Sequence, residues 1–257
     1  MQHQNLLLDE LKAATLASYK PQTGETIRQG LEAIPTGIPA LDDALVTGGF
    51  PTNHIVELFG EPAGGKTTLA LAAAQNCQRL GGNVGYIDTE HSFPVGLAHN
   101  LGLDSKALLI TQPDSGEDAV EQTLFMLTSK TFDLLIVDSV TALNPTRNVE
   151  HSRFVKQFLT KVADTITTSG CSVVLTNQTR ATLRNPGATE RSTGGNVTAY
   201  YTTIRIKLAT SNMSGLYNPQ QPAEQIGSRV EATIVKNRLG TPVTVEYGMA
   251  FQHAIFP

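Results

Sequence analysis

The 257-residue sequence has no tryptophan and only two cysteines, Cys77 and Cys171. So few cysteines exclude a disulfide-stabilised scaffold, and their spacing is not that of a metal site. Because both lie in apolar surroundings, we expect buried thiols in a reducing compartment. The sequence also lacks any apolar run of about 18 residues, which excludes a transmembrane helix on pattern alone.

Charge is scarce as well, since charged residues make up 16% of the chain and the formal net charge is −4. This balance argues against a uniformly basic coat for nucleic acid but is compatible with local basic patches. Acidic residues interrupt the apolar stretch within residues 1–20, which is not typical of a secretory signal. We therefore expect a globular, cytoplasmic protein with no membrane partner.

Apolar and amphipathic segments alternate through the centre of the chain. We expect strands at 54–60, 83–90, 107–113, 133–139 and 172–178, and helices at 66–80, 116–129 and 152–168. Continuous apolar strands separated by amphipathic helices indicate a mostly parallel sheet covered on both faces. The segments 200–210, 228–237 and 241–248 alternate with period two, which favours antiparallel strands that extend the sheet. The predicted fold class is α/β.

Residues 5–19 are predicted to form a helix, because Leu7, Leu8, Leu11 and Ala14 make an apolar stripe. A turn-rich stretch, "KPQTGETIRQG", follows it. We therefore divide the chain into an N-terminal helix with its linker, residues 1–30, and a core, residues 31–257. The stripe has to pack against an apolar surface, and the pattern alone does not exclude that this surface belongs to its own domain.

The octet "GEPAGGKT" at residues 60–67 matches the phosphate-binding pattern G-x-x-x-x-G-K-[ST], between a predicted strand and a predicted helix. Its glycines let backbone N–H groups turn inward, where a side chain would collide with phosphate. Lys66 is expected to reach the β- and γ-phosphates of ATP, and Thr67 to bind Mg²⁺. The predicted nucleotide-binding residues are Gly60, Glu61, Pro62, Ala63, Gly64, Gly65, Lys66, Thr67, Thr68 and Asp138.

Polar residues end three of the predicted strands. Asp138 follows four apolar residues and is the second predicted Mg²⁺ ligand. Asp88 and Glu90 are both candidates for the carboxylate that activates water, and alternation does not choose between them. Asn177 and Gln178 end another strand, where a side-chain amide is a candidate sensor of the γ-phosphate.

Further segments occur in a characteristic order. They are "IDTEH" (87–91), "TQPDSGEDA" (111–119), "VDSVTAL" (137–143), "STGGN" (192–196) and "VKNRLGTP" (235–242). Together with the phosphate loop they resemble the bacterial RecA recombinase family, from about residue 5 to residue 252. The resemblance implies a RecA-like P-loop ATPase core, a helical filament on single-stranded DNA, and ATP held between neighbouring subunits. It also implies that the N-terminal arm packs on the adjacent protomer and that Tyr200 lies at the subunit interface.

The resemblance assigns roles that the residues alone left open. Glu90 matches the catalytic glutamate, and Gln178 matches the residue that links the γ-phosphate to a DNA-binding loop. Lys236 and Arg238 match a pair that reaches a neighbour's phosphates, although by pattern alone they are a solvated strand end. With Lys66, these form the expected catalytic set.

The segment 179–196, "TRATLRNPGATERSTGGN", matches the second DNA-binding loop and carries basic residues with little apolar content. Arg153 matches a contact to the DNA backbone. The predicted DNA-binding residues are Arg153, Arg180, Arg184, Arg191, Thr193, Gly194, Gly195 and Asn196.

The sequence departs from the family at several places. The first DNA loop, residues 144–154, is short, and Leu97 replaces an aromatic residue that stacks on the nucleotide base. Thr160 replaces an arginine near the DNA path. Since the sequence ends at Pro257, we expect the family's C-terminal domain, which helps to take up duplex DNA, to be missing.

The expected function is a DNA-dependent ATPase that assembles on single-stranded DNA and exchanges strands in recombination and repair. Whether duplex DNA is also bound stays open. The alternative is a RecA-like accessory module that binds ATP and assembles with another recombinase without exchanging strands. A hexameric helicase motor is a weaker alternative, because "STGGN" and "VKNR" follow recombinases.

Overall fold

The computed structural model describes residues 33–146, 149–180, 191–192, 196–218, 221–250 and 255–256. The predicted helix at 5–19 and the linker that follows it lie outside these residues. No helix in the described part of the chain is long and apolar enough to span a bilayer.

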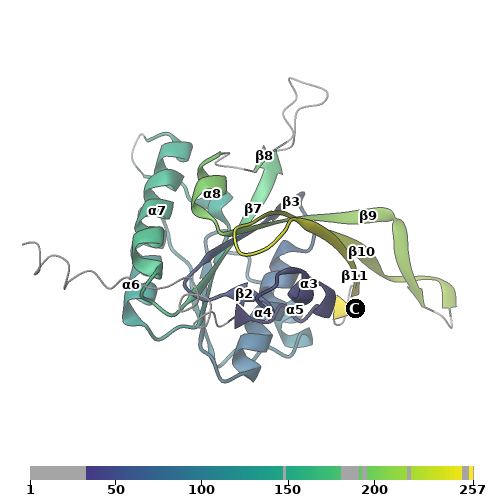
Figure 1. Cartoon of the computed structure of the whole chain (residues 1–257). Helices are drawn as coiled ribbons and strands as arrows, with labels where there is room; N and C mark the ends of the chain where they lie inside the picture. The colour runs from purple at the N-terminus through teal and green to yellow at the C-terminus, as the bar shows by residue number, and fades with distance from the viewer. Residues whose placement is uncertain are drawn as a thin grey trace, which may run out of the picture. The chain divides into compact units, whose positions relative to one another are not determined.

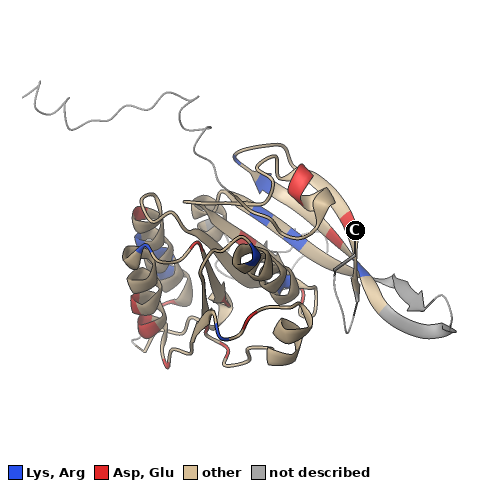
Figure 2. Ribbon diagram, turned by 90° about the horizontal axis from the view of Figure 1, so that it is seen from below, with Lys and Arg blue, Asp and Glu red and all other residues tan. Residues whose placement is uncertain are grey.

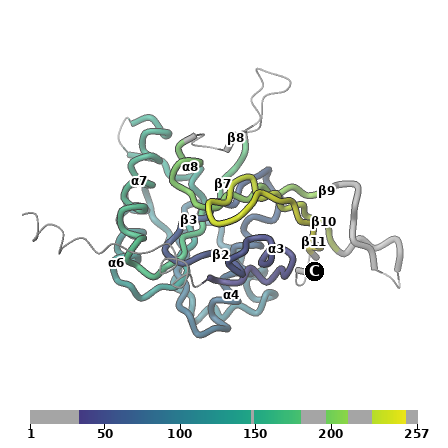
Figure 3. The backbone as a smooth tube through the Cα atoms, viewed as in Figure 1, coloured from purple at the N-terminus to yellow at the C-terminus, as the bar shows by residue number. Residues whose placement is uncertain are grey.

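A large sheet organises the described residues (Figure 1). Its strand order is β12-β11-β10-β9-β3-β7-β6-β4-β5. The bounds are β3 Ile55–Gly60, β4 Val84–Asp88, β5 Leu108–Thr111, β6 Leu134–Asp138, β7 Ser172–Arg180, β9 Ile204–Asn218, β10 Gln221–Asn237, β11 Val243–Ala250 and β12 Ile255–Phe256. Strands β9, β3, β7, β6, β4 and β5 pair in parallel. Strands β10, β11 and β12 continue the sheet in antiparallel fashion, as Figure 3 traces.

The remaining described elements are shorter or cover the sheet. Strand β8, Arg191–Ser192, pairs with the end of β7, and β1, Ala33–Ile34, pairs with β2, Phe50–Pro51. The helices are α3 Pro39–Ala44, α4 Lys66–Arg79, α5 Val95–Asn100, α6 Gly116–Ser129, α7 His151–Ile166 and α8 Asn196–Tyr201, with a 3₁₀ turn, η1, at Val140–Ala142. Ser115 caps α6 by accepting a hydrogen bond from the Asp118 N–H, as expected for a helix N-cap.

The sheet has one apolar core on each face. Leu134 and Ile136 of β6 join the core beneath α3, α4 and α5, whereas Leu135 and Val137 join the core beneath α6 and α7. This alternation follows from the period of two in a strand. Helix α7 buries Phe154, Val155, Phe158, Leu159, Val162 and Ile166, a spacing that places them on one side of the helix.

The predicted α/β fold, its parallel sheet and its antiparallel extension are confirmed. Cys77 and Cys171 are buried free thiols, also as predicted. Burial raises the pKa of the Cys77 thiol to about 12. The prediction of a strand at 200–210 was wrong at its start, because residues up to Tyr201 form α8 and β9 begins at Ile204. In the ribbon of Figure 2, basic and acidic segments are interspersed rather than gathered on one basic face.

Candidate functional site

The loop 61–65 joins β3 to α4 at the carboxyl edge of the parallel strands. Gly65 is the N-cap of α4 and has a φ of 87°, a left-handed conformation that favours glycine. Gly60 has a φ of 152°, and a Cβ there would lie 2.1 Å from the carbonyl oxygen of Leu208 on β9. The close approach of β9 therefore requires a glycine at position 60 independently of any phosphate.

Lys66 begins α4 and is half-buried. Its ammonium group donates to the carbonyl oxygens of Gly60, at 3.1 Å, and Glu61, at 2.6 Å. Burial lowers the pKa of Lys66, and the carboxylates of Asp138, Glu90 and Glu61 oppose that shift. The cation therefore lies on the phosphate loop, close enough to these carboxylates to interact with them electrostatically.

Asp138 is held by three hydroxyl groups. Thr67 Oγ1 donates to Asp138 Oδ2 at 2.9 Å, and the Tyr86 hydroxyl donates to the same oxygen at 2.5 Å. Thr176 Oγ1 donates to Oδ1. Tyr86 is 1% exposed and its ring packs edge-on against Phe93. The carboxylate therefore has a fixed orientation beside the first turn of α4.

The structure separates the two candidate carboxylates at the end of β4. Asp88 is 1% exposed, and its oxygens accept hydrogen bonds from the N–H groups of Ser92 and Phe93 and from Gln112 Nε2. It anchors the loop that leads into α5. Glu90 lies beyond the strand, is exposed, and accepts a hydrogen bond from Ser139 Oγ. Of the two, Glu90 has the side chain that solvent reaches.

The two amides that end β7 are also different. Asn177 is fully buried; its Nδ2 donates to Glu57 Oε1 at 2.8 Å, and its Oδ1 accepts from Thr141 Oγ1 at 3.1 Å. Gln178 is half-buried and is the register partner of Gly60 in the β3–β7 pair. Gln178 therefore lies level with the start of the phosphate loop.

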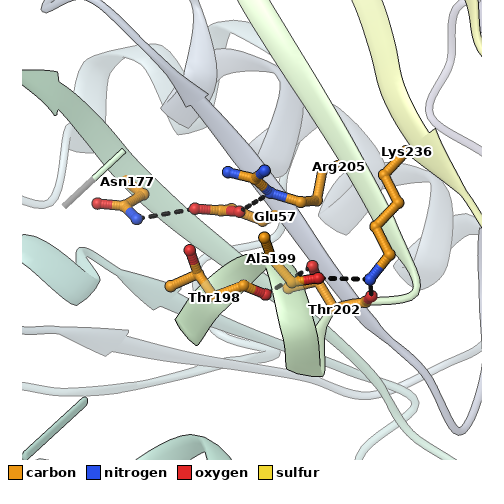
Figure 4. Close-up of polar contacts among 7 residues, drawn as sticks. All are labelled: Glu57, Asn177, Thr198, Ala199, Thr202, Arg205 and Lys236. Carbon is orange, nitrogen blue, oxygen red and sulfur yellow. Dashed lines mark hydrogen bonds and ion pairs between the residues drawn. The ribbon is translucent and has the colours of Figure 1, made fainter. Parts of the chain in front are cut away.

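Lys236 and Arg238 lie at the end of β10 and after it. Lys236 Nζ donates to the carbonyl oxygens of Ala199, at 2.5 Å, and Thr202 (Figure 4). Arg238 Nη2 donates to the carbonyl oxygen of Tyr200 at 2.8 Å. Both cations thus bind the C-terminal end of α8, where the helix dipole favours positive charge. Burial, and then repulsion from Arg238 and Arg205, lowers the pKa of Lys236 to about 8.

Comparisons with known proteins identify the family of the chain. The model of the RecA N-terminal domain matches residues 20–255. Proteins named Protein RecA from Nocardioides sp. and Geobacter metallireducens are each 36% identical to the chain, over 230 and 240 residues. Protein RecA of Sulfurimonas denitrificans is 35% identical over 238 residues. The chain belongs to the RecA family.

These alignments cover 85% to 88% of this RecA-family chain and 64% to 68% of the relatives. The chain therefore spans about two thirds of the length of the relatives that it matches.

The predicted DNA-binding residues of this RecA-family chain are not all described. Arg153 is exposed in the first turn of α7. Arg180 and Arg191 are register partners in the antiparallel pair of β7 and β8, which brings the two ends of the intervening segment together. Asn196 begins α8. Four predicted residues lie outside the described part of the chain: Arg184, Thr193, Gly194 and Gly195.

Leu97 and Thr160, at which the sequence is expected to depart from the family, contribute to packing in this structure. Leu97 packs, partly buried, against the core beneath α4. Thr160 Oγ1 donates to the Lys156 carbonyl at 2.8 Å and shares a hydrogen bond of 2.7 Å with the Tyr201 hydroxyl. This bond joins α7 to α8.

Sequence reasoning missed several residues that organise the site. They are Glu57, Tyr86, Ser139, Thr141, Thr176 and Arg205. One signal was present for Glu57, a single carboxylate within the buried strand "IVELFG", because a buried charge needs a partner. That partner is Arg205, whose Nε lies 2.5 Å from Glu57 Oε2.

Proposed function

We propose that this chain is an ATP-dependent recombinase that binds single-stranded DNA, forms helical filaments and exchanges homologous strands in the cytoplasm. The observation that carries the proposal is the geometry at the carboxyl edge of the sheet. There Lys66 lies on the phosphate loop, Thr67 bonds to Asp138, and Gln178 lies in register with Gly60. Membership in the RecA family supports ATP binding as its shared chemistry.

The oxygens of Thr67 and Asp138 fit Mg²⁺. Mg²⁺ prefers oxygen ligands and is usually held by one or two carboxylates together with substrate phosphates. The hydroxyl and carboxylate oxygens lie 2.9 Å apart, so both reach the same small region beside Lys66. When bound, the ion neutralises negative charge on the phosphate oxygens.

Three side chains of the protein have separate roles in ATP hydrolysis. Lys66 binds the β- and γ-phosphates, and Glu90 orients and deprotonates the attacking water. Gln178 contacts the γ-phosphate and links ATP binding to the DNA-binding segment that follows β7. The position of Glu90 beside Ser139 supports this assignment, because a bonded carboxylate keeps one orientation.

Lys236 and Arg238 complete the site of a second copy of the chain. Charge that develops on the transferred phosphoryl group needs cations, and donors supplied in trans couple hydrolysis to assembly. DNA is bound by Arg153 and by the basic residues of 179–196. Residues 1–30 serve assembly, and residues 31–257 form the ATPase core.

ATP hydrolysis with and without single-stranded DNA tests this function. We expect the rate to rise several-fold on adding DNA, and electron microscopy with a non-hydrolysable ATP analogue to show helical filaments. Lys66→Ala should abolish the nucleotide-dependent filaments. A rate that stays flat while ATP still binds, or wild-type filaments from the Lys66 variant, would contradict the proposal.

A second function, an accessory module that joins another recombinase without exchanging strands, is favoured by one observation. Thr160, where the family resemblance implies an arginine near the DNA path, is neutral and is used to join α7 to α8. Under this alternative the protein binds ATP and assembles, but DNA does not raise its rate of hydrolysis.

A further inference from the structure

We propose that Thr141 is a positioning residue that fixes the main chain of Gln178 and couples the entrances of the two DNA loops. This inference rests on the proposed function, in which Gln178 senses the γ-phosphate. Thr141 lies in η1, directly after the strand that ends in Asp138 and before the first DNA loop. Gln178 lies on the strand that leads into the second DNA loop.

A single hydroxyl group makes the connection. Thr141 Oγ1 donates to Asn177 Oδ1 at 3.1 Å and accepts from the Gln178 N–H at 3.2 Å. A threonine hydroxyl has one hydrogen to donate and lone pairs to accept, so both bonds form at once. The 3₁₀ turn after Asp138 is thereby bonded to two consecutive residues of β7.

The hydroxyl also ends a network of polar side chains in which Glu57 and Asn177 are fully buried. Asn177 Nδ2 donates to Glu57 Oε1, and Arg205 Nε donates to Glu57 Oε2; Figure 4 shows both contacts. Arg205 lies 4.6 Å from the centre of the Phe59 ring. Both oxygens of the buried Glu57 carboxylate thus accept hydrogen bonds, and a satisfied buried polar network is rigid. Asn177 is thereby held from both sides, by Glu57 and by Thr141.

The polar network is connected to the phosphate site through the backbone of Gln178. Val173 and Leu175 face the core beneath α7, so Asn177 lies on that same face of β7. Alternation places the side chain of Gln178 on the opposite face, which it shares with Val174 and the core beneath α4. The Thr141 hydroxyl, on the α7 face of the sheet, therefore fixes the backbone of Gln178. That backbone orients the Gln178 side chain on the α4 face.

Three variants isolate this contact. Thr141→Val has nearly the same shape but loses both hydrogen bonds, and Thr141→Ser keeps the hydroxyl. Thr123→Val is the matched control, because Thr123 is fully buried and its hydroxyl donates only to the Ala119 carbonyl of its own helix. Both valine variants should remain folded at the assay temperature, which thermal unfolding checks.

The first measurement is hydrogen exchange of the Gln178 amide in the full chain, followed by NMR. Loss of a net hydrogen bond is worth about a factor of ten in a local opening equilibrium. Thr141→Val should therefore raise the exchange rate about tenfold, Thr141→Ser should restore slow exchange, and Thr123→Val should leave it unchanged. Equal protection in Thr141→Val and Thr123→Val would overturn the proposal.

The second measurement is ATP hydrolysis with and without single-stranded DNA. Thr141→Val should lower the DNA-stimulated kcat about tenfold, while the affinity of the protomer for a fluorescent ATP analogue changes less than twofold; Thr141→Ser should recover the rate. Faster amide exchange with an unchanged DNA-stimulated rate would overturn the coupling. If the wild-type rate itself ignores DNA, the proposed recombinase function fails, whereas the exchange measurement still accepts or rejects the positioning role.

Discussion

Removal of one hydroxyl group, that of Tyr86, is expected to weaken Mg²⁺-dependent nucleotide binding. Tyr86 is 1% exposed and donates to Asp138 Oδ2, the oxygen that Thr67 also reaches. Tyr86→Phe keeps the ring and its contact with Phe93 but leaves Asp138 with two hydroxyl donors instead of three. Because Tyr86 is buried, bulk water does not reach the position that its hydroxyl group leaves.

The size of the effect follows from this geometry. A hydrogen bond to a charged group contributes about 1.5–3 kcal/mol, so the variant should lose about 1.5 kcal/mol of its free energy of unfolding, or roughly 3–6 °C in melting temperature. Loss of a residue that orients a metal ligand typically costs about 10-fold or more in metal affinity. We therefore expect the Mg²⁺ concentration for half-maximal nucleotide binding to rise about tenfold, with little change in nucleotide binding without Mg²⁺.

Tyr247 provides the matched control. It is 3% exposed, and its hydroxyl has no hydrogen-bond partner among the described residues. Tyr247→Phe makes the same chemical change at a hydroxyl group that bonds to no carboxylate in the described part of the chain, and it should be neutral or slightly stabilising. Titration of a fluorescent ATP analogue at a series of Mg²⁺ concentrations, with thermal unfolding in parallel, compares the two variants. The same Mg²⁺ dependence in both would refute the reasoning about Asp138.

Two further predictions concern the cations beside α8. Arg238→Ala should cut DNA-stimulated hydrolysis at least tenfold while leaving ATP affinity of the isolated protomer nearly unchanged; a large loss of protomer affinity, measured by nucleotide titration, would place the residue in cis. Because the pKa of Lys236 is lowered to about 8, its positive charge is present below that pH and lost above it, so hydrolysis should fall as pH rises through 8. Lys236→Arg, which stays charged, should remove that fall, and an unchanged pH profile would exclude Lys236 as its source.

The long elements could be predicted from sequence because their periodicity repeats over several turns or strand positions. Helix α6, Gly116–Ser129, was predicted with its observed bounds. The helices α3, α5 and α8 were missed, since each has six residues and completes fewer than two turns of about 3.6 residues. A helix this short shows too little of its period to be recognised.

The site could be predicted only in part, because strand ends and distant partners are not readable from spacing. In a continuous strand, Asp88 and Glu90 would point to the same face, so the alternation of side chains did not distinguish them. In the structure β4 ends at Asp88, and the two side chains lie in different surroundings. The ion pair of Glu57 and Arg205 joins residues 148 positions apart. These two residues lie opposite each other in the register of β3 and β9. The pair can be recognised only once that register is known.

Strand β9 links the phosphate loop to the segment predicted to bind DNA. It begins shortly after α8 and pairs in parallel with β3. In addition, the Leu208 carbonyl lies against Gly60, and Arg205 binds Glu57 and lies over the Phe59 ring. Arg205 is also the register partner of Lys236 on β10, whose ammonium group binds the end of α8. The end of α8 is therefore connected to β10 through Lys236, and β10 is connected through β9 to β3 at the start of the phosphate loop.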